Sequence, residues 1–126
     1  MKTVLIVDTD LGFVFWLGHI LDGAAYSALP AKSVPDAALL VTQFRLTVDV
    51  LAINPALTGS LDFIAALCRA PKDVSVIGVF NNPQQIVHIP GLNAAHPKPT
   101  VFDEMAKAEW LEYIECALRS IHHAVS

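Results

Sequence analysis

Short apolar runs alternate with longer stretches of helical periodicity along the whole chain, and this alternation limits the fold more than any other feature. Most of the apolar runs are rich in β-branched residues and stop at polar or turn residues, as strands buried in a parallel sheet do. Strands are expected at residues 3–7, 26–31, 48–53 and 74–80, and helices at 10–23, 33–44, 60–69 and 103–124. The pattern predicts one domain of the α/β class over residues 1–126, with helices packed on a parallel sheet.

Local signals support these boundaries. Asp10 and Ser33 stand immediately before helical stretches, where an N-cap residue accepts hydrogen bonds from the first turn. The least regular part is 81–97, in which only residues 84–89 could form a helix, of about one and a half turns. Pro97 would fall in a fifth strand. Because proline donates no hydrogen bond to a sheet, that strand is expected at an edge.

Composition excludes several classes of protein. The formal net charge is -4 and no cluster of lysine or arginine occurs, so the chain lacks the electrostatic footprint of a nucleic-acid-binding protein. The least charged stretch, 11–31, is interrupted by Asp22 and Pro30, and it is not the clean run of about 20 apolar residues that a membrane span needs. Cys68 and Cys116 lie on apolar helical patterns. They predict two buried thiols and a reducing, cytoplasmic environment.

Side chains that could act together follow the ends of the expected strands. These residues are Asp8, Thr9, Asp10, Asn54, Phe80 and Lys98. Parallel α/β sheets gather functional groups at the carboxyl ends of their strands, so the six are expected to converge on one pocket. Acids after the first strand, a polar residue after the third and Lys-Pro after the fifth resemble the receiver domain of two-component response regulators. The resemblance covers nearly the whole chain. It implies a flavodoxin-like (βα)5 fold in three layers, with a parallel five-stranded sheet in the order 2-1-3-4-5 and a shortened region in place of helix four.

The phosphorylation pocket of the resembled family is incomplete here. In that family an acidic pair and an acceptor aspartate hold magnesium, and the acceptor takes a phosphoryl group. Asp8 matches the first acid, but Thr9 stands in place of the second and Asn54 in place of the acceptor. An amide is not a nucleophile, and Mg²⁺ prefers anionic oxygen ligands. We therefore expect no metal site, weak or absent Mg²⁺ binding and no other cofactor.

Two further positions depart from the family. Phe80 stands where a hydroxyl residue contacts the phosphoryl group, and Ala95 stands where an aromatic side chain reports activation. Lys98 is retained. Without a phosphoryl group to bind, Lys98 is expected to form a partly buried ion pair with Asp8 and a hydrogen bond with Asn54.

These departures predict a degenerate receiver domain that is not phosphorylated and is not an enzyme. It would act as a phosphorylation-independent protein-interaction and signalling module. Two alternatives stay open. One is a ligand-sensing pseudo-receiver, in which Phe80, Asn54 and Lys98 contact a small molecule. The other is an active receiver that uses Asp10 in a displaced acidic site.

A protein partner or a second copy of the chain is expected, and no nucleic acid or membrane. The partner would be a histidine kinase, an output domain or another signalling protein. The apolar fraction of 54%, above the usual value of about 45–50%, suggests a covered surface. Phe15 and Trp16 are the candidate interface residues, because a helix facing one core buries only a stripe. The spacing of His88, His96, His122 and His123 fits no zinc pattern.

Overall fold

The computed structural model describes residues 1–69 and 73–125, and their side chains as far as residue 119. The elements follow one another as β1 (Thr3–Val7), α1 (Leu11–Gly23), β2 (Ser27–Ala31), α2 (Val34–Gln43), β3 (Val50–Ile53), α3 (Ser60–Cys68), β4 (Ser75–Phe80), the 3-10 turn η1 (Pro83–Gln85), β5 (Ala94–Pro97) and α4 (Glu104–Val125). In the described residues the strands form a parallel sheet in the order β2-β1-β3-β4-β5. The predicted fold class and strand order are confirmed.

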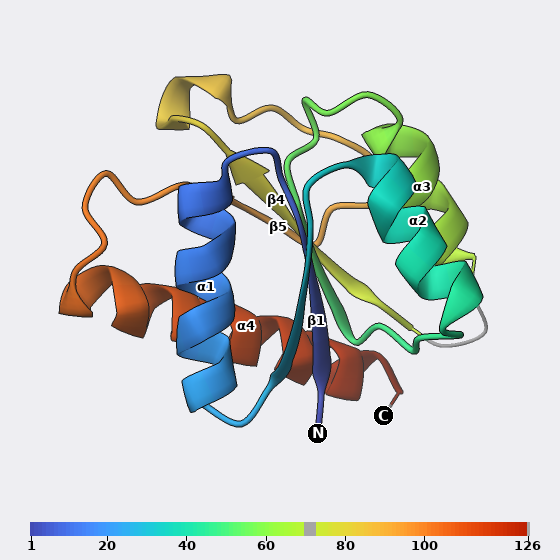
Figure 1. Ribbon diagram of the computed structural model, residues 1–126, viewed down its shortest axis with the longest axis horizontal. Helices are drawn as coiled ribbons and strands as arrows, with labels where there is room; N and C mark the ends of the chain where they lie inside the picture. The colour runs from blue at the N-terminus through green and yellow to red at the C-terminus, as the bar shows by residue number, and fades with distance from the viewer. Residues whose placement is uncertain (70–72, 126) are drawn as a thin grey trace.

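Helices cover both faces of the sheet, which gives three layers (Figure 1). α1 and α4 lie on one face, and α2 and α3 lie on the other. A cluster of buried side chains under α1 and α4 is built around Phe13, Trp110 and Ile114. A second cluster, under α2 and α3, includes Ile64 and Leu67. The sheet is therefore buried on both sides, which is why its central strands are apolar throughout.

The expected helix starts are confirmed. Asp10 Oδ1 accepts a hydrogen bond from the Phe13 N–H at 3.3 Å, and Ser33 Oγ accepts one from the Asp36 N–H at 3.2 Å. Both are N-caps of the expected kind. The buried residues of α1 are Phe13, Val14, Leu17, Ile20 and Leu21.

The prediction of two buried thiols is wrong. Cys68 and Cys116 are both exposed. α3 turns its bulkier side chains, Phe63 and Leu67, toward the sheet, and this rotation leaves Cys68 outside. Apolar spacing on a short helix fits more than one rotation, and the larger side chains decide it because they bury more apolar surface.

The connection between β4 and β5 is short of helix, as predicted. It contains only η1, and β5 lies at an edge of the sheet with Pro97 as its last residue. Leu92 from this connection covers β4 in place of a helix. A Cβ placed on Gly78 would lie 2.7 Å from Leu92 Cδ1, so the close approach of Leu92 depends on a glycine in the strand.

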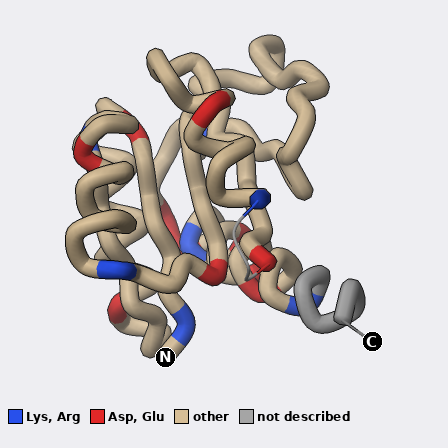
Figure 2. Tube along the Cα trace, turned by 90° about the vertical axis from the view of Figure 1, so that its right-hand side faces the viewer, with Lys and Arg blue, Asp and Glu red and all other residues tan. Residues whose placement is uncertain are grey.

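Charges are sparse on the molecule and absent from one long segment. No lysine, arginine, aspartate or glutamate occurs between Asp73 and Lys98, and much of the chain trace is uncharged (Figure 2). Among the described residues, no helix combines the length and the apolar character that crossing a bilayer requires.

His96 gives the fold a measurable pH dependence. Its ring stacks on Tyr113 of α4 with the ring centroids 3.6 Å apart, and burial lowers the pKa of His96 below its ordinary value of 6.5. Between the two pKa values the unfolded chain binds more protons than the folded one, so stability should fall as the pH drops below about 6.5. The folded protein loses this contribution completely once His96 itself is protonated.

The test is urea denaturation between neutral pH and pH about 5, a window chosen from the ordinary histidine pKa. His96→Phe, which keeps a ring against Tyr113, should flatten the pH dependence. His19→Gln changes an exposed histidine and should leave it intact. An unchanged slope in His96→Phe would assign the effect to other groups.

Candidate functional site

Asp8 follows β1 and is the buried centre of the candidate site. The residue is 1% exposed. Its Oδ1 accepts hydrogen bonds from Asn54 Nδ2 at 3.3 Å and from the Asp10 N–H at 3.3 Å. Its Oδ2 lies 2.7 Å from Lys98 Nζ. A buried carboxylate is costly unless a cation and hydrogen-bond donors surround it, and Asp8 has both.

Lys98 is held at the site by β5 and engages three side chains. Its backbone N–H donates to the Phe80 carbonyl at 2.8 Å, which extends the pairing of β4 with β5 by one residue. Nζ lies 2.7 Å from Asp8 Oδ2 and 3.3 Å from Asp10 Oδ2, and it donates to Asn81 Oδ1 at 2.8 Å. An ammonium group has three donors, so these contacts use its full capacity.

Asn54 is fixed by backbone and side-chain hydrogen bonds. Its backbone N–H donates to the Val7 carbonyl at 3.0 Å, which joins the ends of β3 and β1. Nδ2 donates to Asp8 Oδ1 at 3.3 Å and to Asn81 Oδ1 at 3.5 Å. Oδ1 accepts from the Ala56 N–H at 3.0 Å. Both ends of the amide are therefore occupied, and an aspartate here would place a second carboxylate against Asp8.

Asp10 closes the site on the solvent side. One oxygen caps α1 and the other lies 3.3 Å from Lys98 Nζ, although the side chain remains 47% exposed. Burial alone would raise the pKa of Asp10, but the Phe13 N–H and the Lys98 ammonium outweigh it and hold that pKa below the ordinary value. The same ammonium lies 5.7 Å from the centre of the Phe13 ring.

The structure thus brings four of the sequence-predicted residues together and leaves the others apart. Thr9 is exposed. Phe80 lies beside Gly78 and Leu92, on the face of the sheet that α2 and α3 cover. Ala95 pairs with Gly78 in β5.

Asn81 lies at the site in the place that was predicted for Phe80. The expected hydrogen bond from Lys98 to Asn54 is wrong, because Lys98 donates to Asn81 instead. The alternation of side chains along β4 is the sequence signal that could have identified Asn81 as a site residue. Ile77 and Val79 of β4 face α1 and α4, so residue 81 belongs to the same side as Asp8.

The donor set fits a magnesium ion poorly. Mg²⁺ requires hard anionic oxygens in near-octahedral geometry. Here the Lys98 ammonium lies between the carboxylates of Asp8 and Asp10, and Asn54 Oδ1 already accepts from the Ala56 N–H. Nowhere in the described residues do three His, Cys, Asp or Glu side chains form a metal-binding group. The side chains of His122 and His123 lie outside the described part of the chain.

The two candidate interface residues have different surroundings. Phe15 is 62% exposed. Trp16 is half-buried, and its ring stacks on Phe102 with the centroids 4.9 Å apart. Phe102 of the same chain therefore covers part of the Trp16 ring, which was predicted to contact a partner.

Solved structures resemble this chain over nearly its full length. The response regulator protein TrrA from Thermotoga maritima, solved with Mg²⁺–BeF, is 20% identical with a TM-score of 0.73, covering 94% of this chain and 100% of that one. The N-terminal domain of a response regulator/sensory box/GGDEF protein from Carboxydothermus hydrogenoformans is 17% identical with a TM-score of 0.78, covering 99% and 100%. The signal receiver domain of an HD domain-containing protein from Pseudomonas fluorescens is 17% identical with a TM-score of 0.76, covering 98% and 90%.

These likenesses concern the fold. No protein-family model matches this chain, and no curated protein matches it. The chain has the fold of a response-regulator receiver domain, with an asparagine at the end of β3 and a lysine after β5.

Proposed function

We propose that this domain is a phosphorylation-independent interaction module built on the receiver fold, and that it acts in the cytoplasm without enzymatic activity. It would present a fixed surface to a protein partner, such as a histidine kinase or an output domain. A receiver that is switched by phosphorylation needs a nucleophile, a metal and groups that stabilise the transferred charge. The site retains only the last of these, in Lys98.

The observation that carries this proposal is the neutral Asn54 inside a hydrogen-bonded network. Its amide donates to Asp8 and accepts from the Ala56 N–H. Lys98, the cation that could bind a phosphoryl oxygen, already contacts Asp8, Asp10 and Asn81. A phosphoryl group would have to displace these contacts without a metal ion to stabilise it.

The test is incubation with acetyl phosphate and Mg²⁺, followed by intact-protein mass spectrometry. Wild type is expected to gain no phosphoryl group. Asn54→Asp is also expected to stay unmodified, because it restores the nucleophile and leaves Thr9 in place of the second acid. In both proteins, Mg²⁺ with beryllium fluoride should leave the melting temperature unchanged.

Three outcomes would contradict the proposal. A hydroxylamine-sensitive label on wild type that Asp10→Asn removes would support an active receiver with a displaced acidic site. A label on Asp8 would place the acceptor within the ion pair. Efficient labelling of Asn54→Asp would show that one substitution separates this site from an active one. An active receiver of established response should be labelled in parallel as a positive control.

A further inference from the structure

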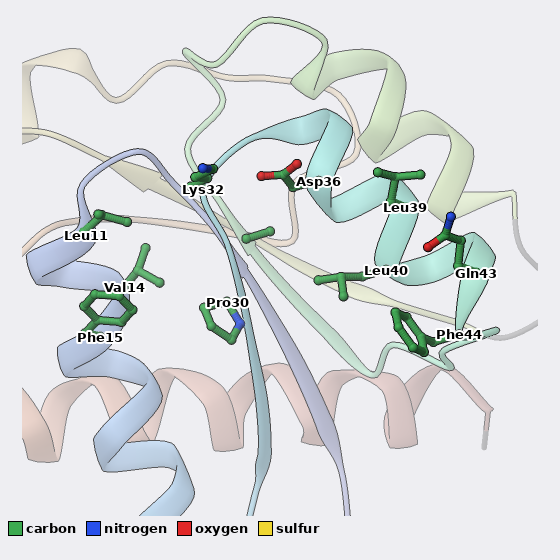
Figure 3. A pocket seen from close by; sticks show the side chains of 11 residues that line it. Leu11, Val14, Phe15, Pro30, Lys32, Asp36, Leu39, Leu40, Gln43 and Phe44 are labelled. Atoms are coloured by element: carbon green, nitrogen blue, oxygen red, sulfur yellow. The ribbon is translucent and has the colours of Figure 1, made fainter.

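A groove runs along the open edge of the sheet, away from the site at the strand ends. Figure 3 shows it between α1 and α2, with Pro30 of β2 between the two helices. Its volume is about 520 Å³. We refer to it as the edge groove. Phe15 stands on its α1 side, and Leu39 and Phe44 stand on its α2 side.

Large apolar side chains around the edge groove are exposed. Leu11 is 47% exposed, Phe15 62%, Leu39 51% and Phe44 67%. Taking about 200 Å² for an aromatic side chain, the two phenylalanines leave roughly 250 Å² in contact with water. The leucines bring the apolar surface to roughly 400 Å², within the ~300–600 Å² of the largest patch on a typical monomer, which is often functional.

The edge of β2 does not favour an added strand. β2 is the first strand of the sheet and pairs only with β1 among the described strands. Ser27 donates to Lys2 and Ala31 accepts from Asp8, so the backbones of Ala28 and Pro30 turn to the open side. Pro30 has no N–H to offer there. An occupant of the edge groove must therefore be held by side-chain packing.

The charges at the edge groove are balanced and of opposite sign. Lys32 and Asp36 are the charged residues that line it, and both lie at the same end (Figure 3). Within the described chain, neither side chain forms an ion pair with the other or with a third residue. The whole chain carries a net charge of -4, whereas the residues that line the edge groove carry one charge of each sign. Two copies can therefore meet here without bringing like charges together.

We propose that the edge groove is the interface of a symmetric dimer. In a two-fold contact the phenylalanines at the rims of one groove pack into the groove of the other copy, and Lys32 of each copy faces Asp36 of the other. Such isologous contacts need a surface complementary to itself, which this neutral, apolar face provides. Two patches of roughly 400 Å² give about 800 Å² of apolar contact, below the ~1,200 Å² at the low end of stable specific interfaces, so the dimer should be weak and concentration-dependent. The proposal goes beyond the interaction function and holds whether or not the domain is phosphorylated.

A small molecule fits the edge groove less well. Ligand pockets enclose about 70–90% of the ligand surface. The four large apolar side chains around this groove, those of Leu11, Phe15, Leu39 and Phe44, are about half exposed or more, so the groove is an open trough and not an enclosed cavity.

Sedimentation velocity over a concentration series tests the dimer. The wild-type protein should shift from the monomer mass of 13.6 kDa toward twice that value as concentration rises. Phe15→Glu and Phe44→Glu each place a charge on a side chain that packs into the groove of the other copy, and each should weaken the dimer at least about 100-fold. The control is Leu61→Glu on α3, which changes a side chain of similar exposure, 56%, and should leave dimerisation unchanged. Circular dichroism should show all three variants folded.

Charge reversal tests the arrangement of the dimer. Lys32→Asp makes the patch wholly acidic and Asp36→Lys makes it wholly basic, so each variant alone should dimerise at least about tenfold more weakly. Mixing the two should give a heterodimer. A wild-type protein that remains monomeric up to about 1 mM overturns the proposal, even if a peptide or small molecule binds the groove. The proposal is also overturned if Leu61→Glu weakens dimerisation as much as the phenylalanine variants do, or if the phenylalanine variants dimerise as wild type does. It is overturned as well if the mixed Lys32→Asp and Asp36→Lys variants form no heterodimer.

Discussion

Replacing Lys98 with methionine is expected to lower the free energy of unfolding by about 3 kcal/mol, because breaking a buried ion pair leaves an uncompensated charge. Asp8 is 1% exposed and lies 2.7 Å from Lys98 Nζ, whose side chain is 10% exposed. Methionine keeps the length and apolar stem of lysine, so the loss reports the charge. The effect should lie toward the low end of the range for buried pairs, since Asp8 keeps its hydrogen bonds from Asn54 and the Asp10 N–H.

Urea denaturation monitored by circular dichroism measures this loss. Lys107→Met, on the exposed surface of α4, is the matched control and should change stability by less than about 0.5 kcal/mol. The double variant Asp8→Asn, Lys98→Met should be more stable than Lys98→Met alone, because it removes the unpaired charge together with its partner. A loss below about 1 kcal/mol in Lys98→Met would place the pair in the range of solvent-screened surface pairs.

Replacing Trp110 with alanine is expected to cost about 3–5 kcal/mol, the usual range for a large aromatic side chain in a core. Trp110 is 2% exposed. Its ring packs edge-on against Phe13 of α1 and Tyr113, with the centroids 5.2 Å apart in both pairs. The residue therefore joins α4 to α1 as well as to the sheet, and its removal leaves a cavity between the two helices.

Trp16→Ala is the comparison for this variant. Trp16 is half-buried and stacks on Phe102, itself 47% exposed. Its loss should cost about 1–2 kcal/mol, nearer the average point mutation. Chemical denaturation followed by far-ultraviolet circular dichroism suits both variants, because tryptophan fluorescence changes when either of the two tryptophans is removed. A smaller loss for Trp110→Ala than for Trp16→Ala would mean that α4 is not docked as described.

Periodicity predicted the fold because both faces of the sheet are covered. A strand buried on two sides must be apolar throughout, and such a run differs plainly from a helix with one apolar stripe. The start of β3 illustrates the limit of this reasoning. Val48 and Asp49 precede the strand as observed, and the Asp49 carboxylate accepts the Thr3 N–H at 2.8 Å. A polar side chain can take over a backbone pairing at a strand end, and the sequence alone does not reveal it.

The charged members of the site and Asn54 were predictable from the sequence, and Asn81 was not. Asp8, Asp10 and Lys98 follow strands of a parallel sheet, so topology alone brings them to one edge. Whether Asn81 or Phe80 faces the site depends on the side of the sheet to which the last residue of β4 points. A strand turns successive side chains to opposite faces, so an error of one position exchanges a buried phenylalanine for a hydrogen-bonding amide.

The short connection between β4 and β5 has a consequence for local unfolding. Regions with little packing open with less free energy than the whole molecule does. β5 lies at an edge and follows a connection whose described helical structure is the single turn η1. Its detachment would be among the least costly openings of the sheet. Because Lys98 follows β5 directly, such an opening would also withdraw the ammonium group from Asp8, so the fraying of one edge strand and the loss of the central ion pair are a single event.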